Sequence, residues 1–150
     1  MNKFEEIIHE LGIQLNLPLH AERGFICRLN INNIFHIQLE HEENRNRILL
    51  ATYITEIPPG RFREDILKEA LKINNLFPLD GIFSFSERAN KLALFIYLPF
   101  ISLTAQQLYQ HLDQFIEKAD KWRVAIETGQ IASISTSTSR SLPPPFAPRP

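Results

Sequence analysis

Residues 92–98 read Leu-Ala-Leu-Phe-Ile-Tyr-Leu, a strand-length segment that is apolar at every position. A strand with one face in water alternates apolar and polar residues, because successive side chains point to opposite faces of the sheet. Both faces of this strand therefore need a cover. Residues 48–54 are nearly as apolar, and a chain of 150 residues has few helices with which to cover two sides of a sheet. The sequence thus predicts apolar surface that is offered to partners.

The residues before these strands form a predicted helix and a hairpin. Apolar residues at three- and four-residue spacing from Phe4 to Leu15 indicate an amphipathic helix that ends near residues 12–16. Alternating apolar residues at 25–31 and 35–40 predict two strands of a hairpin. The intervening Asn32-Asn33 favours a tight turn, since asparagine tolerates positive φ. A third strand is expected over residues 47–56, before Pro58-Pro59-Gly60 stops it.

The second half of the domain repeats this alternation of helix and hairpin. The apolar arc of residues 61–75 predicts a helix that touches two neighbours, because the arc is wider than a one-sided surface helix needs. A second hairpin joins residues 82–85 to residues 92–98. Thr104 and Gln107 offer a capping box for a long last helix with an apolar stripe up to Ile126. The predicted fold class is α+β, in the order helix, three antiparallel strands, helix, two strands, helix.

The composition changes after this last helix. We assign residues 1–127 to one domain, since about 100–150 residues is a common domain size. Residues 128–150 are rich in Ser, Thr and Pro, and half of the ten prolines lie in the last eight residues. Such a segment buries too little apolar surface to offset its ordering entropy. We expect a disordered, solvated tail and favour it over a polyproline ligand.

Charge and cysteine usage narrow the class of partner and the compartment. Sixteen basic and seventeen acidic residues give a formal net charge of -1, which supplies no field to gather nucleic acid or anionic membrane. Cys27 is the single cysteine, so the chain has no internal disulfide and suits a reducing compartment. The acidic start does not resemble a signal peptide, and no apolar run is long enough for stable membrane insertion. We expect a cytoplasmic protein.

The sequence contains no convergent catalytic motif. The five glycines stand apart, so no phosphate-binding loop is present, and the spacing of His36 and His41 gives no metal site. Cys27 lies among the inward residues of a predicted strand, where cysteine behaves as a small hydrophobe. We therefore expect no enzyme, no catalytic residue, no metal and no cofactor.

Several stretches together resemble the class I type III secretion chaperones, the Tir-chaperone and SycE-like family, over about residues 1–126. The matching pieces are the amphipathic start at residues 4–12, the strand at 25–31, the helix Ile-Leu-Lys-Glu-Ala-Leu-Lys-Ile-Asn at 66–74, and the last helix at 112–122. Among members, the chlamydial SycE-like chaperones are the most similar. The order and spacing of these four stretches carry the resemblance, rather than any single motif.

The resemblance implies a non-enzymatic homodimer that holds the extended N-terminal segment of secreted effector proteins until export, with the export ATPase as a further partner. It maps the dimer interface to the second helix and the late strands, at Phe62, Ile66, Leu67, Ala70, Leu71, Phe83, Phe85 and Leu94. It maps effector binding to the first helix and the early strands, at Phe4, Ile8, Phe25, Ile34 and Phe35.

Two other classes of function stay open from the residues alone. One is a small α+β enzyme or ligand-binding domain with a pocket between sheet and helices. The other is a dimeric adaptor that binds folded partners. Converging polar groups in a pocket would favour the first, and a flat patch without affinity for unfolded segments would favour the second.

Overall fold

The computed structural model describes residues 1–76 and 80–130. Their order of elements is α1 (Lys3–Leu15), β1 (Ile26–Ile31), β2 (Phe35–Glu42), the 3-10 turn η1 (Glu43–Arg45), β3 (Arg47–Glu56), α2 (Arg61–Leu76), β4 (Ile82–Ser86), β5 (Lys91–Pro99) and α3 (Ala105–Thr128). This confirms the predicted α+β class and order. The predicted tail, residues 128–150, begins at Thr128, which is the last residue of α3. Residues 131–150 of this tail lie outside the described residues.

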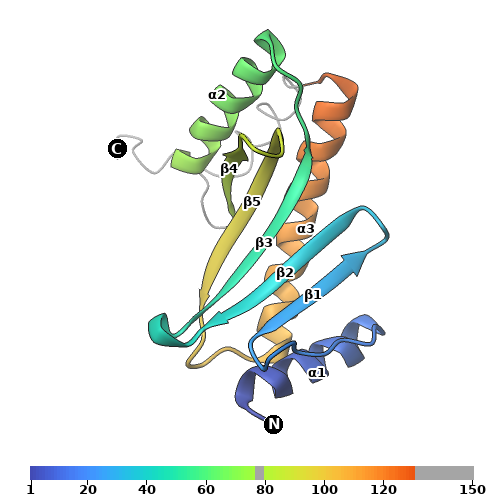
Figure 1. The fold of residues 1–150 in the computed structure, drawn as a ribbon, viewed down its shortest axis with the longest axis vertical. Helices are drawn as coiled ribbons and strands as arrows, with labels where there is room; N and C mark the ends of the chain where they lie inside the picture. The colour runs from blue at the N-terminus through green and yellow to red at the C-terminus, as the bar shows by residue number, and fades with distance from the viewer. Residues whose placement is uncertain (77–79, 131–150) are drawn as a thin grey trace, which may run out of the picture.

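All five strands form one antiparallel sheet in the order β1-β2-β3-β5-β4 (Figure 1). The long strands β3 and β5 pair over their whole length, with a register shift between Tyr53 and Thr55. β2 lies beside the first part of β3, whereas β4 lies beside the first part of β5. The β1-β2 and β4-β5 hairpins therefore widen the sheet at opposite ends of the central β3-β5 ribbon.

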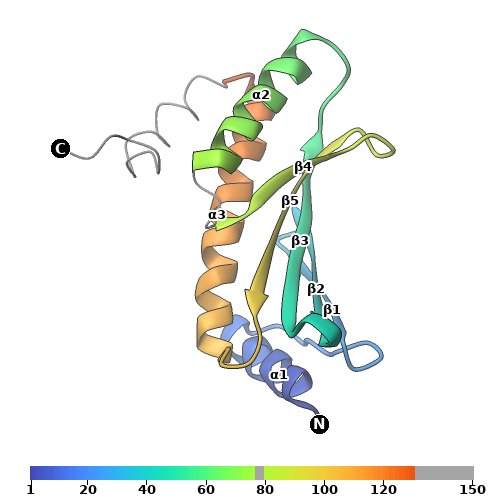
Figure 2. The ribbon, with the colours of Figure 1, turned by 90° about the vertical axis from the view of Figure 1, so that its left-hand side faces the viewer.

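The helices of residues 1–76 and 80–130 cover one side of this sheet and leave the other side without a helix (Figure 2). Figure 2 shows α2 and α3 on the same side of the strands, with α1 at the lower end and the opposite side of the strands bare. The 24-residue α3 packs along β3, and α1 packs against α3. Trp122 of α3 lies against Phe83 of β4, with ring centroids 4.2 Å apart. The core lies between this helical layer and the inward side chains of the strands.

Local sequence signals set the ends of these elements. The Gln107 N–H donates to the Thr104 hydroxyl at 3.1 Å and the Thr104 N–H donates back to the Gln107 side chain at 3.0 Å, which confirms the predicted capping box. Asn32 and Asn33 have φ of 53° and 57°, as the predicted hairpin turn requires. Gly129 ends α3 in the left-handed conformation, with φ of 73°.

Candidate functional site

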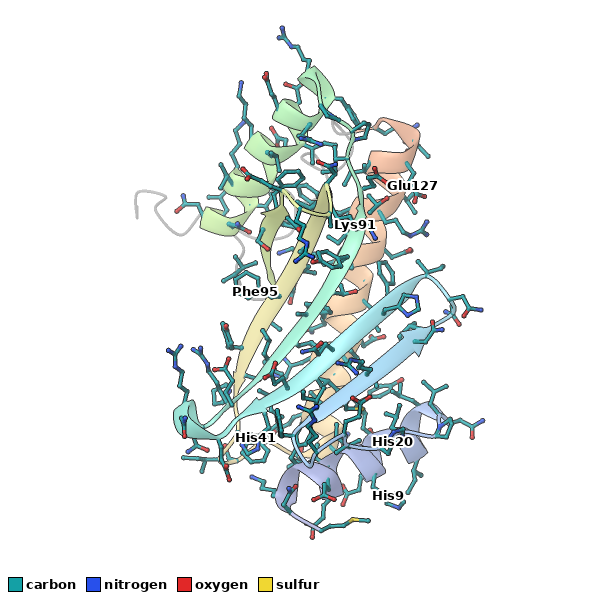
Figure 3. All side chains as sticks on the ribbon, in the orientation of Figure 1. His9, His20, His41, Lys91, Phe95 and Glu127 are labelled. Carbon is teal, nitrogen blue, oxygen red and sulfur yellow. The ribbon has the colours of Figure 1, made fainter. Side chains whose placement is uncertain are left out.

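The outer face of the sheet is apolar at its centre. Along β3 and β5 the buried residues alternate with partly exposed ones, so that one set faces α3 and the other faces away from every helix. Within the described residues no helix reaches the second face of strand 92–98, so the cover that its outward apolar side chains need is not supplied by those helices (Figure 2). Figure 3 views this face, with Phe95 and Lys91 labelled. Its central side chains are Leu49, Ala51, Tyr53, Ala93, Phe95 and Tyr97.

Aromatic rings and cations surround a shallow hollow on this outer face. The hollow has a volume of about 420 Å³, and His36, Gln38 and Ser84 contribute to its lining. At one end the Arg47 guanidinium lies 3.6 Å above the centre of the Tyr97 ring. At the other end the Lys91 ammonium lies 5.5 Å from the centre of the Tyr53 ring. This arrangement suits burial of apolar side chains from a second molecule, since it gathers apolar area without a converging catalytic set.

The two edges of the sheet differ in their backbone groups. At the start of β1, the Ile26 N–H and C=O face outward and pair with Glu22. Because alternate residues of an antiparallel strand face the same way, Arg28 and Asn30 also direct their N–H and C=O outward. At the other edge, the backbone of Phe83 in β4 bonds a side chain of α2. The β1 edge is thus the one with room for an added strand.

The five residues predicted for effector binding divide into two groups. Phe25 and Ile34 flank β1 and are 37% and 45% exposed. Phe4, Ile8 and Phe35 are at most 2% exposed and belong to the core of the chain itself. Their side chains are therefore not displayed on the surface, and a partner at this end of the sheet reaches Phe25 and Ile34 first.

The eight residues predicted for the dimer interface also divide. Leu71 is 68% exposed, and three more are partly exposed, namely Phe62, Leu67 and Phe85. The remaining four face the core and are buried within one chain: Ile66, Ala70, Phe83 and Leu94. The sequence analysis placed the apolar residues on these elements but could not separate the inward set from the outward set.

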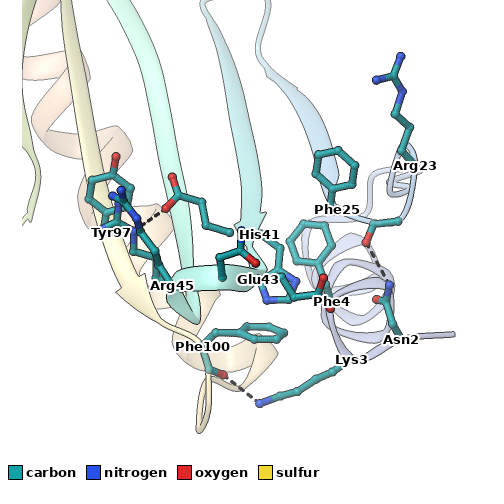
Figure 4. Close-up of a pocket in the computed structure, with 14 residues that line it drawn as sticks. Asn2, Lys3, Phe4, Arg23, Phe25, His41, Glu43, Arg45, Tyr97 and Phe100 are labelled. Atoms are coloured by element: carbon teal, nitrogen blue, oxygen red, sulfur yellow. Dashed lines mark hydrogen bonds and ion pairs between the residues drawn. The ribbon is translucent and has the colours of Figure 1, made fainter.

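A larger cleft lies at the lower end of the fold (Figure 4). It has a volume of about 790 Å³ and is formed by four segments that are far apart in sequence: the start of α1, residues 23–25, residues 41–47, and the end of β5 with Phe100. Of its lining residues only Phe4 and Phe25 were predicted to bind a partner, because no linear motif joins these segments. Arg45, Arg47 and Tyr97 were missed for that reason.

Burial shifts the pKa values of two titratable groups, Cys27 and Lys118. Burial raises the pKa of the Cys27 thiol to about 11, with a further contribution from the Glu22 carboxylate, so at neutral pH this cysteine is a thiol and a poor nucleophile. Burial lowers the pKa of Lys118 to about 8, and the nearby Asp80 partly opposes this shift. Within residues 1–76 and 80–130, no three His, Cys, Asp or Glu side chains are grouped so that they could hold a metal ion.

Known proteins share this fold. A model of the Tir chaperone protein (CesT) family matches residues 6–123. The chain resembles a solved ExsC-ExsE complex with a TM-score of 0.70 and 17% identity, over 83% of this chain and 93% of that chain. It resembles the HopA1-SchA chaperone-effector complex with a TM-score of 0.67 and 19% identity, over 81% and 94% of the two chains.

A third similar structure is the Yersinia pestis type III secretion chaperone SycH with a fragment of YscM2, with a TM-score of 0.61 and 18% identity, over 80% of this chain and 99% of that chain. No curated protein sequence matches the chain. Among the helices of residues 1–76 and 80–130, none is long and apolar enough to cross a membrane.

Proposed function

This chain belongs to the Tir chaperone protein (CesT) family and is a type III secretion chaperone, and we propose that it binds the extended N-terminal segment of a secreted effector. The observation that carries the proposal is the distribution of apolar surface. The described residues present three such features: a sheet face without a helix, an open β1 edge, and the exposed side chains of Phe25 and Ile34 beside that edge. An effector segment bound there is kept from collapse and aggregation before export.

Strand addition fits the β1 edge best. An extended segment paired with the outward groups of Arg28 and Asn30 gains main-chain hydrogen bonds without requiring a particular sequence. Its alternate side chains can then pack near Phe25 at one end of β1 and Ile34 at the other, and these apolar contacts provide most of the affinity. Phe4, Ile8 and Phe35, which the resemblance assigned to effector binding, lie in the core and in this proposal support the binding surface from below.

We further propose that the protein is a homodimer. A second copy would cover the outer sheet face, where Tyr53 and Phe95 stand away from every helix of their own chain. On α2, which the resemblance assigned to the interface, Leu67 is partly exposed and Leu71 is exposed. Burial of such area stabilises association by about 25 cal/mol for each Å² of apolar surface, before the cost of association is subtracted.

The proposed cycle needs no cofactor, metal or enzymatic step. Holding a segment requires only burial and hydrogen bonds, so release has to be driven by a partner. We propose that the chaperone works in the cytoplasm and delivers its effector to the export ATPase of the secretion apparatus.

Identification of the bound proteins tests this function. Proteins that co-purify with the native full chain are identified by mass spectrometry, and each candidate is then divided into its N-terminal region and its folded remainder. We expect the N-terminal region alone to bind and to become protected from proteolysis over a continuous stretch. Binding only to folded proteins that are not secreted would contradict the proposal and would favour the adaptor function.

A further inference from the structure

The cleft between the start of α1 and the end of β5 has a cationic rim above an aromatic floor. We propose that it anchors one specific element of the bound segment, an aromatic side chain with a carboxylate residue on each side. This inference rests on the proposed function, since it assigns a side-chain class to part of the effector segment. It names a site next to the β1 edge, at which main-chain pairing is expected, and Phe25 belongs to both.

The floor of the cleft is a row of three rings in contact, of which Phe4 and His41 are stacked and His41 and Phe100 are tilted by 45°. The His41 ring lies between Phe4 and Phe100, with ring centroids 5.7 Å from Phe4 and 4.0 Å from Phe100. Phe25 and Tyr97 stand higher on the walls, and they are 37% and 39% exposed. An aromatic side chain placed between these walls would gain offset or edge contacts with rings, in addition to the burial of its own apolar area.

The charge of the rim favours an anion. Four cations line the cleft, Lys3, Arg23, Arg45 and Arg47, against two carboxylates, Glu42 and Glu43. This local excess of two positive charges contrasts with a formal net charge of -1 for the whole chain. A segment with two carboxylates would balance the excess, and guanidinium groups bind carboxylates through strong, charge-assisted hydrogen bonds.

Two of the four cations are engaged already. Arg47 pairs with Glu42 at 2.6 Å and stacks on Tyr97. Lys3 donates to the carbonyl oxygens of Phe100 and Ile101, at 2.9 and 2.6 Å. These bonds hold Lys3 and Arg47 against the wall of the cleft. The other two cations, Arg23 and Arg45, are left to bind a ligand.

Arg23 and Arg45 take part in none of the salt bridges among the described residues. They stand on opposite sides of the cleft, on the 22–25 turn and on η1 (Figure 4). Each of these two guanidinium groups offers a partner to one of the two carboxylates of the proposed ligand.

The turn that carries Arg23 is held in place. Its Phe25 N–H donates to the Glu22 carbonyl at 3.1 Å, and the Asn2 side chain donates to the Gly24 carbonyl at 3.1 Å, which joins the turn to the start of α1. Arg23 has φ of 56°, in a region that residues other than Gly, Asn and Asp seldom adopt. The structure therefore presents Arg23 and Phe25 from a fixed backbone, and little ordering is needed on binding.

The test uses defined peptides and the full chain. The probe is the blocked heptapeptide Gly-Ser-Asp-Phe-Asp-Ser-Gly, with two matched peptides in which Lys replaces both Asp residues or Ala replaces Phe. Binding is followed by the amide chemical shifts of the isotope-labelled protein. We expect the acidic aromatic peptide to bind at least tenfold more tightly than either matched peptide, with the shifts confined to residues 2–4, 23–25, 41–47 and 97–100. We also expect its affinity to fall as salt is raised, since the rim charges are exposed.

Variants of the rim separate recognition from folding. The double variant Arg23→Glu, Arg45→Glu should bind the probe at least tenfold more weakly, whereas Arg45→Lys should retain most of the affinity because the charge remains. Lys121→Glu, on the exposed side of α3, is the matched control and should bind like wild type. Equal binding of the acidic and lysine peptides, or unchanged affinity in the double variant, would overturn the proposal.

The failure of this inference differs from a failure of the proposed function. If the double variant still binds an effector N-terminal region as wild type does, the cleft is not an anchor while the chaperone function stands. If no secreted protein binds the chain at all, the proposed function fails even where the heptapeptide binds the cleft.

Discussion

The side-chain amide of Asn74 bonds both backbone groups of Phe83. Its Nδ2 donates to the Phe83 carbonyl at 2.9 Å, and the Phe83 N–H donates to its Oδ1 at 2.7 Å. Asn74 thus takes the place that a residue of a neighbouring strand would occupy at the edge of β4. Exposed strand edges invite pairing with other chains, and this contact from α2 blocks the middle of one edge. In our proposal, pairing with a partner segment is therefore directed to the β1 edge.

Replacement of Asn74 tests this closure of the edge. Asn74→Leu removes two hydrogen bonds and leaves the partly buried backbone groups of Phe83 without them, so we expect the free energy of unfolding to fall by about 2–4 kcal/mol. Urea unfolding measures the change. Asn75→Leu, one position along and exposed, is the control and should change stability by about 0.5 kcal/mol or less. Equal effects of the two changes would show that the pair with Phe83 contributes little.

Charges beside β1 should weaken effector binding. Phe25→Asp and Ile34→Asp each place a carboxylate where we expect apolar contact with the bound segment, so each should weaken binding by about tenfold or more. Isothermal titration with the N-terminal region of an identified effector measures this. Val124→Asp adds the same charge at an exposed apolar position of α3 and should have no effect. Wild-type affinity in both β1 variants would place the binding surface elsewhere.

The proposed dimer predicts a mass twice the 17.4 kDa of one chain in light scattering at micromolar concentration. Phe95→Glu would bury an unpaired charge between two copies, so we expect the dissociation constant to rise by about 100-fold or more. Tyr109→Glu changes an exposed aromatic residue of α3 and should leave the dimer intact. A folded wild-type monomer would refute the proposal, and an intact Phe95→Glu dimer would move the interface off the outer face.

Because of Lys118, we expect the free energy of unfolding to rise in alkaline solution. Its Nζ donates to the Gly81 carbonyl at 2.9 Å, and burial lowers its pKa to about 8 from an ordinary value of 10.5. Between these two values the unfolded chain binds more protons than the folded chain, so the contribution of Lys118 to stability rises with pH. From pH 7 to pH 9.5 we expect a gain of about 1–2 kcal/mol in wild type relative to Lys118→Met.

Cys27 has the opposite effect on stability, since its contribution falls as pH rises in alkaline solution. Because burial raises the pKa of its thiol to about 11 from 9.0, its contribution to stability is complete below pH 9 and is lost as pH rises through 11. Urea unfolding of wild type, Lys118→Met and Cys27→Ala at each pH separates the two groups. A constant difference between wild type and Lys118→Met from pH 7 to pH 9.5 would contradict the expectation for the lysine.

Much of the fold follows from local sequence signals. The span of β3 is the predicted residues 47–56, and α2 differs from its predicted end by one residue, since Pro-Pro-Gly and a regular apolar arc mark these limits clearly. The apolar run at 92–98 also indicated correctly that this strand has apolar residues on both sides. Together with the small number of helices it also predicted apolar surface offered to partners, but it did not show which side chains form that surface, because this depends on how far the helices reach in three dimensions.

Individual surface residues were harder to predict. Phe4 and Ile8 lie on an amphipathic helix whose apolar stripe could equally face a partner or the core, and the packing of α1 against α3 buries both. Phe4→Asp is accordingly expected to destabilise the chain rather than to act on binding alone. The cleft could not be predicted at all, since its walls come from residues 2–4, 23–25, 41–47 and 97–100.

The docking of α1 against α3 also sets an order of events during synthesis. α1 is synthesised before α3, the helix that packs against its apolar stripe, and α3 begins only at Ala105. At translation rates of about 5–20 residues per second, about 100 intervening residues leave that stripe uncovered for roughly 5–20 s. Over that interval the nascent chain carries an exposed amphipathic N-terminal segment of its own, the same hazard from which we propose it protects its effectors.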